Sequence, residues 1–186
     1  AFGERFKDAL EIMEKKKDLD IIRFYSYIQY PHLVPFENGF SQMIYKPWSL
    51  NYFKIYYYSD HPHLRRSNFI EKFGPYTEHV SVDRSEYRMC VSFIQQKGKG
   101  LFYNNFQSLF KQINPEEEPS TTIRGALTLS ENPFIKFIGD IYRQFRYNYD
   151  LRFLRTNHGF AIQSDIAKLR KESNSFIDLS KAVLNK

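Results

Sequence analysis

The chain has 186 residues, a formal net charge of +6 and a sequence pI near 9.2. Its length fits one globular domain, and a content of 18% aromatic and 42% hydrophobic residues excludes a disordered or low-complexity chain. The single cysteine, Cys90, excludes an internal disulfide and a cysteine-based zinc finger, and no apolar run approaches the roughly 18 residues of a membrane span. We therefore expect an intracellular protein, in the cytoplasm or the nucleus, that makes no membrane contact.

Residues 1–30 are expected to form a helical N-terminal segment. Apolar side chains recur there with helical spacing and predict an amphipathic helix over residues 4–17. Asp18 or Asp20 is suited to cap a second helix, which ends at Pro31. The same stretch also alternates between apolar and polar residues, so its pattern leaves a strand open as the alternative.

The middle of the chain shows mostly strand patterns. From alternation or from β-forming residue types, we predict strands over residues 40–45, 50–58, 79–82 and 86–94. The strand over 86–94 is expected to pair with that over 79–82. A capping pattern from Asn68 to Gly74 predicts a one-turn helix over residues 69–73.

The last part of the chain alternates between helix and strand patterns. In chain order, the predicted elements are a helix over 102–113, an acidic surface loop over 114–122, a strand over 123–129, a helix from Pro133, a strand over 147–153 and a helix over 164–184. Asn132 is suited to cap the helix from Pro133, because its side chain accepts hydrogen bonds from the first N–H groups of a helix. Pro133 fits the first position, where the missing N–H loses no hydrogen bond. The order predicts one α+β domain over residues 1–186, with a largely antiparallel sheet of about five to seven strands and four or five helices.

The segment from residue 143 to residue 155 carries the main functional signal. Its four arginines are interleaved with tyrosine and phenylalanine and are opposed by one acid; they are Arg143, Arg146, Arg152 and Arg155. Arginine pairs bidentately with phosphate, and aromatic rings stack on bases. The segment therefore predicts a surface that binds RNA or single-stranded DNA. On the strand predicted over 147–153, alternation favours a core position for the tyrosines instead.

Two further basic groups are assigned to the same surface. The run Lys97-Gly-Lys99-Gly is predicted to precede a helix, where backbone N–H groups and two lysines are suited to hold a phosphate. It matches neither of the glycine-rich phosphate-binding motifs, so a flexible turn is the alternative. Arg65 and Arg66 follow a predicted turn and form the second group.

His61 and His63 flank Pro62 in that turn. Two histidines at i and i+2 are able to ligate one metal ion, but no third ligand follows from the spacing, so we assign no metal site, no cofactor and no catalytic residue. The pair is loosely similar to the histidine pair of the HUH single-strand endonucleases, which usually carry a bulky hydrophobic residue where Pro62 stands. That resemblance gives a further alternative, a metal-dependent single-strand endonuclease that uses His61 and His63.

The function predicted from the sequence is thus a non-catalytic domain that binds nucleic acid through a basic and aromatic surface. Tyrosine, phenylalanine and arginine are also typical of protein interfaces, so a protein-interaction or scaffold domain of a larger intracellular assembly is the alternative. The first residue is Ala1 rather than methionine, which is typical of a segment of a longer protein and agrees with that alternative. The pattern leaves the oligomeric state open.

Overall fold

A computed structural model describes residues 2–110 and 132–157. This part of the chain contains four α-helices and one five-stranded mixed sheet, which confirms the predicted α+β class. The helices are α1 (Phe2–Lys15), α2 (Phe69–Phe73), α3 (Val82–Gln95) and α5 (Pro133–Phe153). The strands are β1 (Ile21–Arg23), β2 (Leu33–Pro35), β3 (Phe40–Met43), β4 (His63–Arg65) and β5 (Gly100–Tyr103). A short 3₁₀-helix, η1 (Tyr52–Ile55), lies between β3 and β4.

The sheet has the strand order β2-β3-β5-β1-β4. The β2/β3, β3/β5 and β1/β4 pairs are antiparallel, and only β1 and β5 run parallel. A parallel pair needs a long crossover, and the chain between β1 and β5 supplies it, because it holds the hairpin, η1, α2 and α3. The predicted largely antiparallel sheet is therefore confirmed, with one parallel pair near its centre.

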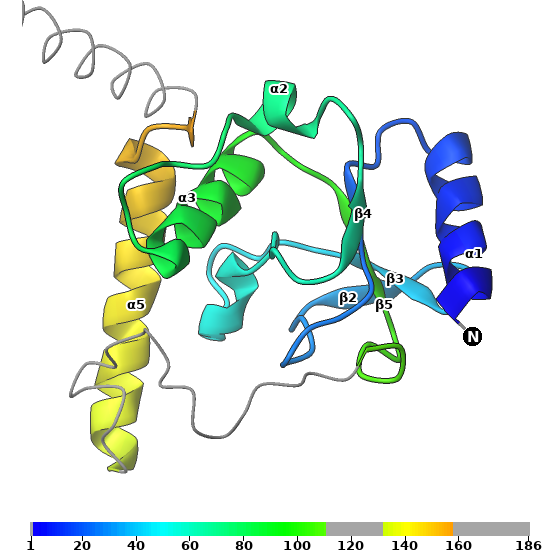
Figure 1. The fold of residues 1–186 in the computed structure, drawn as a ribbon. Helices are drawn as coiled ribbons and strands as arrows, with labels where there is room; N and C mark the ends of the chain where they lie inside the picture. Colours follow the sequence, from blue (N-terminus) through cyan, green and yellow to red (C-terminus); the bar gives the residue numbers. More distant parts are fainter. Residues whose placement is uncertain (1, 111–131, 158–186) are drawn as a thin grey trace, which may run out of the picture.

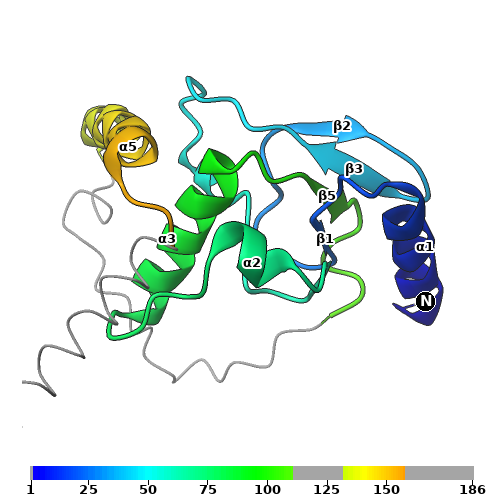
Figure 2. The same ribbon diagram turned by 90° about the horizontal axis from the view of Figure 1, so that it is seen from above.

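Helices cover both faces of the sheet, as the two ribbon views show (Figures 1 and 2). α1 packs on one face, where its buried Ile12 belongs to the same cluster as Ile22 and Leu101. On the opposite face, residues from α2, α3 and η1 form a second cluster with Ile21 and Phe102. α5 lies outside this layer, next to α3 (Figure 2). Successive strand residues thus enter opposite cores, as the two-residue period of a strand requires.

The strand predicted over residues 86–94 is wrong, because these residues belong to helix α3, and no strand forms over 79–82 either. Five consecutive residues of α3, 89–93, are buried, so the helix is enclosed on both of its sides there. Even its polar groups are satisfied inside the protein: the Ser92 hydroxyl donates to the Phe73 carbonyl oxygen at 2.6 Å, and the Cys90 thiol contacts the Tyr58 carbonyl oxygen. In a helix that is buried on both sides, the alternation of apolar and polar residues does not distinguish a helix from a strand.

Three more predicted elements are wrong. The stretch 50–58 forms η1 and turns rather than a strand, and the residues predicted to begin a helix at 102 continue strand β5. The second helix of the expected N-terminal segment 1–30 is replaced by β1, in line with the strand alternative. The loop over 114–122, the strand over 123–129 and the helix over 164–184 lie outside the described residues.

Three further predicted elements and the start of a fourth are confirmed. α1 matches the helix expected over 4–17, β3 the strand over 40–45, and α2 the one-turn helix over 69–73. α5 begins as its sequence requires, since Asn132 Oδ1 accepts a 2.9 Å hydrogen bond from the Phe134 N–H and Pro133 occupies the first turn. Among the described helices, none is both long and apolar enough to cross a membrane.

Candidate functional site

Residues 143–153 of the segment with the arginines and aromatic residues belong to the continuous helix α5, which corrects the strand predicted over 147–153. Tyr147, Leu151 and Leu154 are spaced at i, i+4 and i+7 and pack against the core cluster that contains α3. The Tyr87 hydroxyl on α3 donates a 2.6 Å hydrogen bond to Oδ2 of Asp150. One side of α5 is therefore fixed to α3, and this side includes Tyr147 but not Tyr149.

A buried lysine attaches the same helix to η1. Lys54 is fully buried, and its ammonium group donates to the Ser49 carbonyl oxygen at 2.9 Å and also to the Pro47 carbonyl oxygen and Gln144 Oε1. Gln144 Nε2 in turn donates to the Pro47 carbonyl oxygen at 2.5 Å. Burial lowers the pKa of Lys54 to about 8. These contacts fix which face of α5 points outward.

The outward face of α5 carries a row of large apolar side chains, here called the α5 ridge. Its members are spaced three or four residues apart and are between 46% and 67% exposed; they are Ile138, Tyr142, Phe145, Tyr149 and Phe153. The rings of Tyr149 and Phe153 contact each other, with centroids 4.7 Å apart. An exposed apolar row of this length on a folded domain is typical of a binding surface.

Two of the four predicted arginines border the α5 ridge. Arg146 precedes Tyr149 by three residues and Arg152 follows it by three, so both are its neighbours on the helix surface. Arg146 Nε lies 3.4 Å from Asp150 Oδ2, and the pKa of Arg146 is raised by the Tyr142 hydroxyl and by this carboxylate. Arg152 is exposed in the last turn of α5.

The other two arginines of the segment lie elsewhere. Arg143 lies toward the domain, where its guanidinium forms a 2.6 Å ion pair with Asp140 and lies 5.0 Å from the ring centroid of Tyr52. Arg155 follows the end of α5 and is exposed. The four charges therefore do not form one patch, although Arg146 and Arg152 lie on either side of Tyr149.

Arg65 ends strand β4 and Arg66 follows it, so neither belongs to α5. Arg66 has a structural role, because its guanidinium donates to the carbonyl oxygens of Leu19 at 2.8 Å and Lys16 at 2.8 Å and also to that of Met13, at the end of α1. Arg65 is exposed on β4, beside the ring of Phe69. These two adjacent arginines thus differ in environment and in role.

The Lys97–Gly100 run leads into strand β5, which begins at Gly100, and not into a helix, which corrects the expected phosphate cradle at a helix start. Its glycines are explained by packing. A Cβ atom on Gly98 would lie 2.5 Å from the Phe93 ring, and one on Gly100 would lie 2.3 Å from Met43 Cε. Lys99 forms a 2.7 Å ion pair with Asp18, while Lys97 is exposed.

The histidine pair binds neighbouring groups of the protein. His61 Nδ1 lies 3.0 Å from the Ser59 hydroxyl, and His63 Nδ1 lies 2.6 Å from the His61 carbonyl oxygen. Burial lowers the pKa of both histidines. In the part of the chain that the structure describes, no group of three His, Cys, Asp or Glu side chains is arranged to hold a metal ion.

Sequence reasoning missed a pocket that Arg23, Glu86 and His61 line together. Its residues come from β1, from α3 and from the loop after η1, so no motif joins them. An arginine at the end of an apolar strand was the only available signal, and it is an ambiguous one. No known family model, curated protein or solved structure matches the chain.

Proposed function

We propose that this domain is a non-catalytic binding module that binds single-stranded nucleic acid, RNA or DNA, on the α5 ridge. One observation carries the proposal, namely the surroundings of Tyr149. Tyr149 is 62% exposed, with Phe145 and Phe153 one turn away on either side and Arg146 and Arg152 as its other neighbours. Stacking surfaces and cations are the two components of sequence-tolerant single-strand binding.

The geometry of the helix suits stacking by successive bases. Side chains four residues apart on an α-helix are separated by about 6 Å along its axis. Base stacking on an exposed ring contributes about 1–3 kcal/mol per base, and this applies to any of the four bases. The ridge therefore supports affinity without strong base preference.

The cations add a term that depends on salt. Each phosphate that Arg146 or Arg152 neutralises contributes about −0.7 to the slope of log K against log salt concentration for a single strand. The net charge of +6 favours the same ligand at longer range. Arg66 and Lys99 already make structural contacts, so we assign the binding to the α5 residues and not to all eight predicted cations.

Fluorescence polarisation with labelled oligouridine and oligothymidine at two salt concentrations tests the proposal. Phe145→Ala combined with Tyr149→Ala is expected to weaken binding about tenfold or more at both salt concentrations. Arg146→Gln combined with Arg152→Gln is expected to reduce the salt slope by about 1.4. The matched controls are Phe36→Ala, which removes an exposed ring on the β2–β3 turn, and Arg65→Gln with Lys7→Gln, which removes two exposed charges on β4 and α1.

Three results would contradict the proposal. They are absence of binding by the unmodified protein at low salt, unchanged affinity in the α5 variants, and equal losses in the controls. The α5 ridge also extends to the apolar Phe134 and Phe137, which suits a protein ligand. Salt-insensitive self-association that the Phe145 and Tyr149 changes abolish, in a protein that binds no nucleic acid, would assign the ridge to a protein interface.

A further inference from the structure

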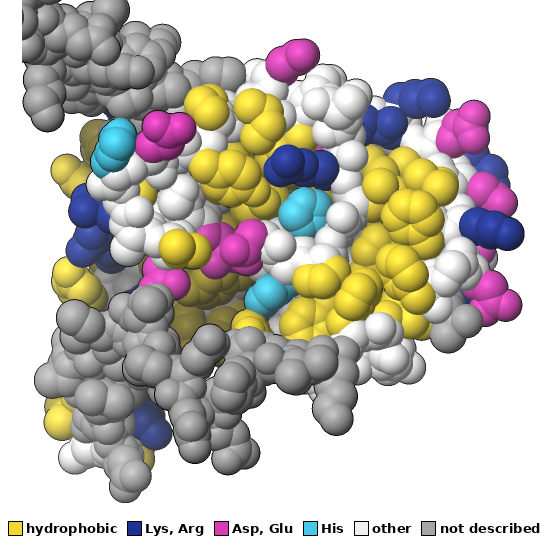
Figure 3. Space-filling view, viewed as in Figure 1, with side chains coloured by type: hydrophobic (Ala, Val, Ile, Leu, Met, Phe, Trp, Pro, Cys, Tyr) yellow, Lys and Arg dark blue, Asp and Glu magenta, His cyan; other side chains and the backbone are white. Residues whose placement is uncertain are grey.

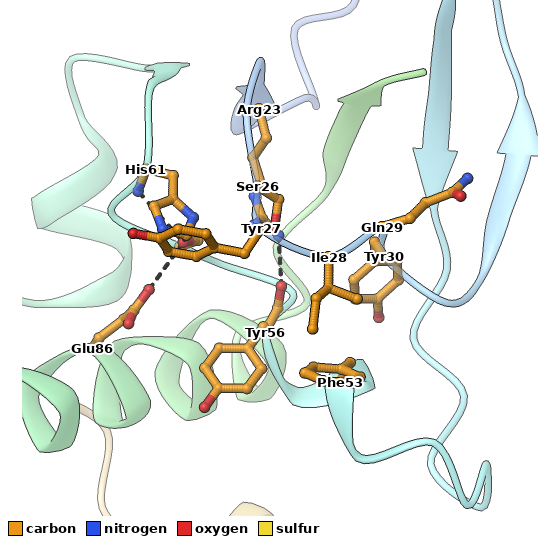
Figure 4. A pocket seen from close by; sticks show the side chains of 11 residues that line it. Arg23, Ser26, Tyr27, Ile28, Gln29, Tyr30, Phe53, Tyr56, His61 and Glu86 are labelled. Carbon is orange, nitrogen blue, oxygen red and sulfur yellow. Dashed lines mark hydrogen bonds between the residues drawn. The ribbon is translucent and has the colours of Figure 1, made fainter. Parts of the chain in front are cut away.

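A pocket with a volume of about 250 Å³ lies between the loop after β1, η1 and α3 (Figure 4). Tyr27, Phe53 and Tyr56 supply aromatic walls, and Arg23 and Glu86 reach it from opposite sides. In the space-filling view, histidine and acidic side chains lie beside hydrophobic ones near the middle of this face (Figure 3). A small pocket with apolar walls and few polar groups is typical of a small-molecule site.

Arg23 is the unusual residue of this pocket. Its side chain is only 2% exposed, on the face of the sheet toward α3. Nη1 donates to the Tyr56 carbonyl oxygen at 2.6 Å, and Nη2 donates to the Ser26 hydroxyl at 3.3 Å. Its Nε is buried and has no hydrogen-bond partner among the described residues. A guanidinium carries five N–H donors, so most of its donor capacity is unused by these residues.

The charge of Arg23 is compensated only indirectly, by the Phe102 ring, whose centroid lies 5.4 Å from the guanidinium carbon, and by the Glu86 carboxylate, which attracts it without forming an ion pair. None of the ion pairs within residues 2–110 and 132–157 includes Arg23. Burial lowers its pKa to about 10, which still leaves the group charged at neutral pH. A buried and unpaired cation is unfavourable, because the protein interior replaces little of the lost hydration. An anionic group that reached Arg23 would restore the missing partner.

Glu86 restricts the charge of such a ligand. Its Oε1 accepts from the Ser59 hydroxyl at 3.0 Å and from the Asp60 backbone N–H at 3.2 Å, and its carboxylate lines the same pocket as Arg23. Because the single hydroxyl proton of Ser59 goes to Glu86, His61 Nδ1 must carry a proton and donate to Ser59 Oγ. A second negative charge on the ligand would face Glu86 without a matching cation.

We propose that this pocket binds a small aromatic monocarboxylate, whose carboxylate pairs with Arg23 and whose ring lies between Tyr27, Phe53 and Tyr56. The planar guanidinium matches a carboxylate in two parallel hydrogen bonds. The proximity of Glu86 favours a monoanion over a phosphate dianion, and the pocket volume limits the ligand to a small ring system. The site is separate from the α5 ridge and does not depend on nucleic-acid binding.

Isothermal titration calorimetry of the full chain with benzoate tests this assignment, with benzamide and phenyl phosphate as matched probes. Benzoate is expected to bind saturably with one site per chain, and benzamide and phenyl phosphate at least about tenfold more weakly, since one lacks the charge and the other carries two. Equal binding of benzamide, tighter binding of phenyl phosphate, or no saturable binding of benzoate would overturn the proposal.

Two variants separate the roles of the charges. Glu86→Gln keeps an oxygen acceptor for Ser59 and Asp60 but removes the negative charge, so benzoate binding is expected to tighten several-fold. Arg23→Lys keeps the charge but loses the planar pair, so binding is expected to weaken about tenfold. Arg152→Lys makes the same change on α5 and is expected to leave the affinity for benzoate unchanged. If Arg23→Lys fails to fold, Glu86→Gln decides alone: unchanged or weaker benzoate binding in that variant refutes the site.

Discussion

The Tyr87 hydroxyl on α3 donates a 2.6 Å hydrogen bond to Oδ2 of Asp150 on α5, and their helices contact each other through the rings of Tyr87 and Tyr147, 5.8 Å apart. Asp150 is 8% exposed, so this bond satisfies a carboxylate that is largely removed from water. It raises the pKa of Tyr87, together with burial as the larger cause. The orientation of the α5 ridge thus depends on a contact between two residues 63 positions apart.

Tyr87→Phe is expected to lower the free energy of unfolding by about 1–3 kcal/mol, because it leaves the Asp150 carboxylate with one fewer donor. Chemical denaturation measures the loss, and hydrogen exchange is expected to show faster exchange of α5 amides. Tyr149→Phe removes an exposed hydroxyl on the same helix and is expected to stay within about 0.5 kcal/mol. Equal stability of the two variants would contradict the anchoring role of Tyr87.

Gly98→Ala is expected to destabilise the protein by about 1–3 kcal/mol. The new methyl group would lie 2.5 Å from the fully buried Phe93 ring, so that ring or the backbone would have to shift inside the core. Gly3→Ala is the matched control, since nothing lies within 4 Å of the added atom and alanine favours helix α1. The control is expected to be neutral or to raise the midpoint of thermal unfolding. A stable Gly98→Ala protein would restore a functional explanation for that glycine.

Arg66→Gln is expected to cost about 1–3 kcal/mol of stability, because three carbonyl oxygens near the end of α1 lose a charged donor. Arg65→Gln changes the neighbouring residue, whose guanidinium is exposed over Phe69, and is expected to cost less than about 1 kcal/mol. Circular dichroism during urea unfolding compares them. A smaller loss in Arg66→Gln than in Arg65→Gln would refute the structural role of Arg66.

Stability is expected to fall as the pH rises above about 10. Burial raises the pKa of Tyr45, Tyr57 and Tyr147 to about 12, whereas an unfolded tyrosine ionises near its ordinary value of 10. Above that value these tyrosines hold more protons in the folded state than in the unfolded state, so each increase in pH favours unfolding. The lowered pKa values of Lys54 and Arg23 act in the opposite direction, but these are two groups against three tyrosines. The midpoint of denaturant unfolding, determined at about pH 9, 10 and 11, measures the effect. A midpoint that stays constant or rises over this range would contradict it.

The sequence predicted α5 correctly only at its beginning. Asn132 and Pro133 are local signals, and the structure uses both at the helix start. The strand expected over 147–153 was wrong because the apolar residues there satisfy two periods at once: every second residue is aromatic or aliphatic, and Tyr147 and Leu151 also fall one turn apart. The helix forms since nothing between Pro133 and Leu154 interrupts it, and α3 supplies a partner for one of its sides.

The two candidate sites differ in how far the sequence indicates them. The composition of the 143–155 segment pointed to the α5 ridge, although it could not show that Tyr149 is exposed and Tyr147 is packed. Nothing local pointed to the pocket, because Arg23, His61 and Glu86 meet only after β1, the loop before β4 and α3 have assembled. The sequence of a strand also does not show whether the side chain of an arginine in it is exposed to solvent or buried.

By itself, the sequence determined the α+β class, the presence of helix α1, the start of α5, the short helix α2 and the aromatic and basic character of one segment. These follow from local properties: capping residues, propensity and regular spacing. Only the tertiary structure decided that α3 is a helix enclosed on both sides, that Arg23 is buried without a carboxylate partner among the described residues, and that the α5 ridge faces outward. These three features depend on which surfaces pack together, and contacts between residues distant in the sequence determine that packing.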